Sequence, residues 1–393
     1  MRNYNTITSF NLMKMKTTYP FLLFFFHLVC FGQSKDPIYQ IPFHLYDNQI
    51  LIKSKINNET VNLLFDTGCM GVILDKNFIL NNKINSLKTY KNPLNFKLHS
   101  FYKKIKLISS SDIRKQLGDK YQGIAGVDFF SNYLVEIDYL KQKINLYNLN
   151  SKIDRSYQKI NTTHNVKNIQ IFKRFTTPIT LKIDSITKIT GNFLIDTGSS
   201  RNITTIKLLN KYKPLLVSSK NEKEILNASP HGFNNPIYYR VPKLIFNNKS
   251  YDNLIIDDNN DVNHNITGLK GILGGGFLKH FKILINYKNS EIYIKDNFSK
   301  IGFTKNIISD GVKIKEYRYP KRKLIIGSVL KNKNGLKIGD NVLKINNIDY
   351  QKIQLEKYYL GKKNNDTINY TVKRNGKILK IKTVVKKMFS REE

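Results

Sequence analysis

Phe65-Asp66-Thr67-Gly68 and Ile195-Asp196-Thr197-Gly198 decide how this chain is interpreted, because they are nearly the same phrase written twice. A short apolar run typical of a buried strand precedes each copy, from Val61 to Phe65 and from Asn192 to Ile195. The two aspartates lie 130 residues apart, about one globular lobe. Two carboxylates brought together by two similar lobes are suited to general acid–base hydrolysis of a peptide bond.

A second repeat follows the first at a similar interval. Gly123-Ile124-Ala125-Gly126 begins one segment and Gly271-Ile272-Leu273-Gly274 begins the other, and the two align without gaps through Leu146 and Ile294. Each half of residues 40–300 therefore contains a strand, Asp-Thr-Gly, and later an apolar-apolar-Gly element. This pattern predicts an internal duplication. The alternative, that both Asp-Thr-Gly runs are ordinary turns, explains neither the apolar lead-in nor the duplication.

The order of these elements resembles the pepsin-like aspartic proteases, which are related to the retropepsins and in which each lobe contributes one Asp-Thr-Gly loop. The resemblance covers residues 40–300. It implies a mainly β, two-lobed acid-protease fold, and an endopeptidase in which Asp66 and Asp196 activate a water molecule to cut a peptide or protein substrate. No cofactor and no metal are implied.

The resemblance also assigns supporting roles to the residues beside the two aspartates. Thr67 and Thr197 should cross-link the loops, and Gly68 and Gly198 should allow their close approach. Ser199 should donate a hydrogen bond to Asp196.

The place equivalent to Ser199 in the first loop holds Cys69, where the family usually has Ser or Thr. Two alternatives stay open for it: a weak thiol donor to Asp66, or a small buried apolar group. A hairpin from Asn95 to Lys106, with Tyr102 as its aromatic residue, is our candidate for the flap over the cleft.

The C-terminal residues resemble a PDZ domain of the bacterial type. The resemblance rests on Gly335-Leu336-Lys337-Ile338-Gly339-Asp340 followed by an alternating strand. A short helix at Ile353 to Leu360 and an Asn375-Gly376 hairpin turn come after it. The resemblance implies a small β/α domain that binds a peptide ligand. Its carboxylate-binding loop would be Ile301, Gly302 and Phe303.

The N-terminus has the features of a secretory signal peptide, with Lys14 and Lys16 before an apolar run that extends to Phe31. Translation could start at Met13 or Met15. We expect a signal peptide at 1–32, protease lobes at 33–155 and 156–297, and the PDZ-like domain at 298–393. The expected protein is a secreted, periplasmic or cell-envelope monomer of the bacterial type, without a transmembrane segment once the signal is removed.

Composition restricts the other function classes. Once the signal peptide is removed, Cys69 is the remaining cysteine, so no intramolecular disulfide is expected, and no His-Glu-x-x-His or Gly-x-Ser-x-Gly motif occurs. The formal net charge is +36, but the lysines are interspersed, which favours solubility over specific nucleic-acid binding. Two alternatives remain: a catalytically weak or inactive pseudo-protease that binds peptides, and an anchor protein for acidic polymers. A clustered basic face would favour the anchor.

Overall fold

The computed structural model describes residues 36–84, 94–98, 101–105, 107–113, 117, 120–162, 174–209, 211–212, 217–218, 225–229, 232–234, 237–259, 268–297, 307–317, 321–330, 335–355, 358 and 361–388. The expected signal peptide lies outside these residues. The described chain is mainly β, with two short α-helices, α2 (Lys76–Asn81) and α4 (Gly275–Leu278), and two 3-10 helices, η1 (Val127–Phe130) and η3 (Tyr350–Lys352).

The first lobe is an eight-stranded sheet in which the Asp66 strand is central. Alternating apolar residues on the two longest strands bury one face, as at Ile50, Ile52 and Ile56. Its order is β7-β6-β3-β4-β9-β5-β8, with β2 beside β3. The strands are β2 (His44–Tyr46), β3 (Gln49–Ile56), β4 (Glu59–Asp66), β5 (Val72–Asp75), β6 (Leu94–Leu98), β7 (Phe101–Ile105), β8 (Leu107–Ser111) and β9 (Gly123–Gly126).

The second lobe repeats this arrangement around the Asp196 strand. Its order is β13-β14-β21-β15-β20-β19-β16, and β13 also pairs with β19. The strands are β13 (Thr176–Lys182), β14 (Lys188–Asp196), β15 (Ile203–Ile206), β16 (Val217–Ser218), β19 (Ile237–Phe246), β20 (Lys249–Asn259) and β21 (Leu269–Gly274).

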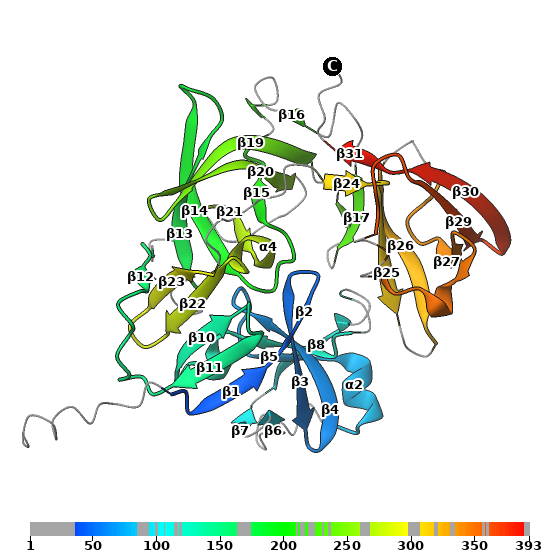
Figure 1. The fold of residues 1–393 in the computed structure, drawn as a ribbon. Helices are drawn as coiled ribbons and strands as arrows, with labels where there is room; N and C mark the ends of the chain where they lie inside the picture. Colours follow the sequence, from blue (N-terminus) through cyan, green and yellow to red (C-terminus); the bar gives the residue numbers. More distant parts are fainter. Residues whose placement is uncertain are drawn as a thin grey trace, which may run out of the picture.

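A six-stranded sheet joins the two lobes, in the order β1-β11-β10-β22-β23-β12. Figure 1 shows its central strands, β10 and β22, between the lobes. In their antiparallel register Glu136 pairs with Leu284, which is its own counterpart in the duplicated segment. The two halves of the internal duplication are therefore related by an approximate two-fold axis that passes through this pair. The strands are β1 (Tyr39–Pro42), β10 (Leu134–Asp138), β11 (Lys143–Tyr147), β12 (Gln158–Lys159), β22 (Phe281–Asn286) and β23 (Glu291–Asp296).

The C-terminal residues form a separate sheet, in the order β18-β17-β26-β27-β29-β30, with β25 beside β26 and β28 beside β27. Its strands β17 and β18 come from the residues expected for the second lobe (Figure 1). A two-stranded sheet of β24 and β31 lies nearby in the chain's C-terminal region. The strands are β17 (Ile225–Ser229), β18 (Gly232–Asn234), β24 (Ile307–Ser309), β25 (Val312–Tyr317), β26 (Lys323–Leu330), β27 (Asn341–Ile345), β28 (Ile348–Asp349), β29 (Thr367–Arg374), β30 (Lys377–Val384) and β31 (Lys386–Met388).

Local features of the C-terminal unit follow the sequence pattern. Asn375 and Gly376 both have positive φ, 47° and 82°, as a two-residue hairpin turn requires. Leu355 and Tyr358 are helical, and the Tyr358 N–H donates to the Gln354 carbonyl at 2.9 Å. The unit has its own buried apolar cluster, separate from the one that the two lobes share.

The hairpin expected as a flap does form, as β6 and β7, but its contacts are with the core. Phe96 and Phe101 are buried among aromatic side chains of the first lobe. β6 pairs with β3 at Lys55 and Ile56, the end of β3 remote from the Asp66 loop. The Tyr102 side chain lies outside the described residues. Among the helices of the described residues, none is long and apolar enough to cross a membrane.

Candidate active site

The two Asp-Thr-Gly loops begin where the two central strands end. Asp66 is the last residue of β4 and Asp196 the last of β14. β9 runs parallel to β4 and β21 parallel to β14, with Asp66 opposite Gly126 and Asp196 opposite Gly274. The apolar-apolar-Gly elements thus lie directly beside the aspartate strands.

Reciprocal hydrogen bonds of the two threonines tie the loops together. The Thr67 N–H donates to the Thr197 hydroxyl oxygen at 3.1 Å, and the Thr197 N–H donates to the Thr67 hydroxyl oxygen at 3.0 Å. Each hydroxyl in turn donates across the interface, Thr67 to the Ile195 carbonyl at 2.9 Å and Thr197 to the Phe65 carbonyl at 2.8 Å. Both threonines are buried. This four-bond network fixes the separation and orientation of the loops.

The glycines let each loop approach the opposite carboxylate. A Cβ atom on Gly68 would stand 2.7 Å from Cγ of Asp196, and one on Gly198 would stand 2.3 Å from Cγ of Asp66. Any side chain at either position would therefore displace the opposite carboxylate. The structure brings Asp66 and Asp196 together, each against the glycine of the other loop.

The two carboxyl groups differ in the donors that surround them. Asp196 accepts two backbone N–H bonds at one oxygen, from Gly198 at 2.8 Å and Ser199 at 3.1 Å. Asp66 accepts one, from Gly68 at 2.7 Å. Burial raises the pKa of both groups, and the neighbouring Asp196 charge raises the pKa of Asp66 further, to well above its usual range. The additional N–H donor therefore favours the ionised form at Asp196 and the protonated form at Asp66.

Ser199 interacts differently from the expectation that the resemblance implied, and the contacts of Cys69 bear on its two alternatives. Ser199 contacts Asp196 through its backbone N–H, and within the described residues its hydroxyl makes no hydrogen bond to that carboxylate. The Cys69 thiol donates to the Met70 carbonyl at 3.5 Å, and not to Asp66. Burial, with the Asp66 charge, raises the pKa of the thiol to about 12, so it stays protonated at neutral pH. Of the two alternatives for Cys69, these contacts favour the one in which it does not hydrogen-bond the dyad.

Sequence reasoning missed Gln49, which connects the first lobe to the second loop. Its side-chain amide donates to the Gly198 carbonyl, and its oxygen accepts a bond from the Tyr121 hydroxyl at 3.0 Å. Gln49 precedes Ile50, which pairs with Phe65 just before the first aspartate. A sequence signal was available: Gln49 is a polar residue at the start of the strand that pairs with the Asp66 strand, and this end of the strand lies beside the Asp-Thr-Gly loop.

Arg174 holds the same position in the second half of the duplication. It precedes Phe175, whose carbonyl accepts the Ile195 N–H at 2.9 Å just before the second aspartate. Its guanidinium charge acts on both carboxyl groups, opposing the rise that burial causes in the pKa of Asp66 and of Asp196. Gln49 and Arg174 therefore occupy equivalent positions in the two lobes beside the dyad, and one is neutral whereas the other is cationic.

The turn before Gln49 connects three parts of the chain. Asn48 donates to the Ser200 carbonyl and accepts from Lys279, both at 2.9 Å, so it holds the second lobe. Asp47 forms an ion pair with Lys313 of β25 at 2.6 Å, with both side chains 41% exposed. The turn next to the dyad thus also touches the C-terminal unit.

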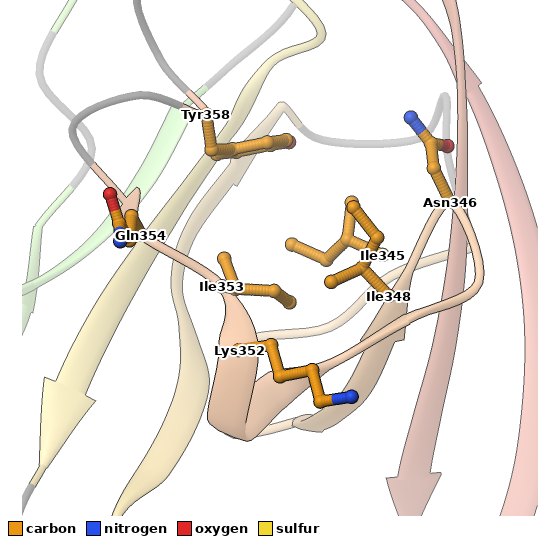
Figure 2. Close-up of a pocket in the computed structure, with 7 residues that line it drawn as sticks. All are labelled: Ile345, Asn346, Ile348, Lys352, Ile353, Gln354 and Tyr358. Carbon is orange, nitrogen blue, oxygen red and sulfur yellow. The ribbon is translucent and has the colours of Figure 1, made fainter.

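A separate hollow of about 320 Å³ lies in the C-terminal unit, between β27, β28 and η3. Figure 2 shows Ile345, Ile348 and Ile353 converging in it, with the Tyr358 ring to one side. The lining is mainly apolar, which suits an apolar side chain. The expected carboxylate-binding residues Ile301, Gly302 and Phe303 lie outside the described residues. Across the described part of the chain, no group of three or more His, Cys, Asp or Glu side chains is arranged to hold a metal ion.

Comparisons with known proteins give little beyond this geometry. No protein-family model matches the chain, and no curated protein sequence matches it. Among solved structures, the chain is similar to an aspartic proteinase from Irpex lacteus, with a TM-score of 0.42 and 12% identity, over 68% of this chain and 99% of that one. The assignment of a mainly β, two-lobed, pepsin-like fold depends on the duplicated loops and strand registers described above.

Proposed function

We propose that this protein is an aspartic endopeptidase of the pepsin-like kind, in which Asp66 and Asp196 activate a water molecule to hydrolyse peptide bonds. The observation that carries the proposal is the reciprocal pairing of the two loops, with Thr67 and Thr197 bonded to each other and each glycine against the opposite aspartate. A purely structural turn needs no buried pair of like-charged groups, because such a pair destabilises the fold.

The mechanism follows from the unequal surroundings of the two carboxyl groups. Asp196, ionised, takes a proton from a water bound between the two groups, and the oxygen of that water attacks the carbonyl carbon of the substrate. Asp66, protonated, donates its proton to the carbonyl oxygen, which gives a neutral gem-diol. Collapse of the gem-diol transfers a proton to the departing amine, breaks the C–N bond and restores one proton to the pair. No covalent acyl-enzyme forms.

The experiment compares residues 33–393 with the variants Asp66→Asn and Asp196→Asn on a mixed peptide library between about pH 3 and pH 8. We expect each variant to lose more than about 1000-fold in kcat/KM while it keeps the circular dichroism of the parent. A statine-type inhibitor should block the parent. Ordinary turnover by either folded variant would overturn the dyad, and peptide binding without cleavage by the parent would indicate a pseudo-protease instead.

We infer that the C-terminal unit binds a peptide or protein segment. Two features support this: β26 already accepts an added antiparallel strand, β17, and the hollow under Tyr358 suits an apolar side chain. Fluorescence titration with peptides that have free or amidated C-termini tests it, with Ile353→Asp as the variant that should lose binding. Equal binding by that variant would exclude the hollow. A secreted or cell-envelope location, tested by fractionation of the producing cell, is part of the same proposal.

A further inference from the structure

The outer face of the C-terminal sheet carries a group of lysines. Lys373 and Lys344 are exposed residues of β29 and β27, and Lys380 and Lys382 are exposed residues of β30. In the strand register Lys344 lies opposite Thr371, which lies opposite Lys380, while Lys382 lies opposite Asn369 and Lys373 opposite Ile378. Paired residues of neighbouring strands project from the same face of a sheet. We call these four lysines the basic face.

The basic face gathers several lysines and few acidic groups on neighbouring strands. Some exposed lysines elsewhere in the described chain are paired with carboxylates, as Lys159 is with Glu291 and Lys249 with Asp296. Among the described residues paired across these strands, one carboxylate lies on the basic face, that of Asp349, opposite Lys344. It caps η3 by accepting the Gln351 N–H at 2.9 Å. None of the four lysines has an ion pair with a described residue. With four lysines and one described carboxylate in these rows, the basic face has a net positive charge.

Two apolar side chains project from the same face. Ile378, opposite Lys373, is 65% exposed, and Val384, opposite Thr367, is 43% exposed. The opposite face is the core, with Tyr370 and Val372 fully buried. The face has no aromatic residue for base stacking and no arginine for bidentate phosphate recognition in its described rows. Lysine charges interspersed with protruding aliphatic groups fit the interface of an anionic bilayer better than a nucleic acid.

We propose that the basic face docks the protein on an anionic lipid surface. β30 is at the outer edge of the molecule in Figure 1, on the side remote from the two lobes, so docking would leave the dyad free. The lysines would meet the lipid phosphates while Ile378 and Val384 enter the headgroup region. The proposal goes beyond the proteolytic function and does not depend on it.

The experiment is co-sedimentation of residues 33–393 with vesicles, without the apolar run before residue 32, which would itself bind lipid. We expect binding to vesicles with about 30 mol% phosphatidylglycerol and no binding to pure phosphatidylcholine, with a steep loss of binding in about 0.5 M salt. The variant Lys344→Gln, Lys373→Gln, Lys380→Gln, Lys382→Gln should lose affinity by about 5-fold per lysine, hence more than about 100-fold in total.

A matched control removes the same charge elsewhere. Lys53→Gln, Lys55→Gln, Lys182→Gln and Lys188→Gln alter four exposed lysines on β3, β13 and β14 and should leave lipid binding close to that of the parent. A thermal melt verifies that both variants are folded. The proposal is overturned if the two variants lose binding equally, because the effect is then one of net charge alone.

The apolar part of the proposal has its own variant. Ile378→Thr with Val384→Thr keeps every lysine and suits an exposed strand, so it should weaken lipid binding several-fold and leave heparin or duplex DNA binding unchanged. If the parent binds heparin or DNA but not the anionic vesicles, the face is a site for another polyanion and the lipid proposal fails. Because the readout is sedimentation, an inactive protease would not affect the result.

Discussion

Asp66 and Asp196 are each followed by Thr-Gly in the sequence, but their surroundings in space differ. The second loop gives its aspartate two backbone N–H donors, and the first loop gives one. The sequence predicts which two residues meet, because the duplicated phrase is short and specific. It cannot predict which of them holds the proton, because that depends on how many N–H groups each turn directs at its carboxylate.

Arg174 should set the acid limit of activity. Its positive charge favours the ionised form of the pair, so Arg174→Met should raise the lower apparent pKa of the dyad. Activity needs one ionised carboxylate, and the acid limb of the kcat/KM profile should therefore move to higher pH.

Two variants make the Arg174 measurement specific. Arg174→Lys keeps the charge and should keep the limb in place, and Gln49→Met alters the equivalent neutral position and should change the rate without moving the limb. An unmoved limb in Arg174→Met, or the same shift in Gln49→Met, would show that the charge of Arg174 does not act on the dyad.

Cys69 should be chemically inert and electrostatically silent. With a pKa of about 12, its thiol is protonated at neutral pH and should react with iodoacetamide far more slowly than free cysteine. Because the thiol faces the Met70 carbonyl, Cys69→Ser should leave the acid limb of the pH profile unmoved. Mass spectrometry of the alkylated protein and the pH profile of the variant measure the two effects. A limb at lower pH in the serine variant would mean that a better donor at this position reaches Asp66.

At the scale of the elements, the threonine network should stabilise both the fold and the site. Thr67→Val removes one donor and one acceptor, and it leaves the Ile195 carbonyl and the Thr197 N–H without their partner. We expect it to reduce the free energy of unfolding by about 2–4 kcal/mol and to reduce kcat strongly. Thr67→Ser keeps the hydroxyl and is the control, and denaturant unfolding measures both. Equal stability of the valine and serine variants would contradict the assigned bonds.

Sequence pattern predicted the strands better than their partners. The runs before the two aspartates are β4 and β14, and the Asn-Gly turn joins β29 to β30. The β6–β7 hairpin was expected to cover the cleft as a flap. In the structure it packs on the first-lobe core instead, because Phe96 and Phe101 are buried there. The turn at Asp47 and Asn48 was missed, although both have positive φ, 47° and 64°, where Asp and Asn are common. Its contacts are with residues far away in the sequence, and a local sequence pattern does not predict such contacts.

At the scale of the whole molecule, the two lobes form one body and the C-terminal unit another. The lobes share a continuous apolar cluster and the sheet in which β10 pairs with β22. The C-terminal unit has few described links to them: three register pairs between β17 and β26, and the ion pair between Asp47 and Lys313. The sequence predicted a separate unit, but not that the second lobe contributes a strand to it, because residues 225–229 carry no signal for a distant partner.

The C-terminal unit, residues 298–393, should therefore fold by itself. Its buried apolar cluster extends from Val312 to Val385 and includes no residue of the lobes. Two ion pairs within the unit, Lys362 with Asp310 and Arg374 with Asp340, each bury their aspartate. The links that the fragment loses are small, since an exposed ion pair contributes up to about 1 kcal/mol and the β17 strand is short.

We expect the isolated unit to unfold cooperatively, with a Tm lower by about 5–10 °C than the same transition in the parent. Calorimetry of the fragment, of the parent and of a parent with residues 225–234 replaced by a flexible linker separates the two links. If the fragment has no cooperative transition, the unit depends on the lobes for its core. If the linker variant melts like the parent, β17 adds nothing to the sheet that it extends.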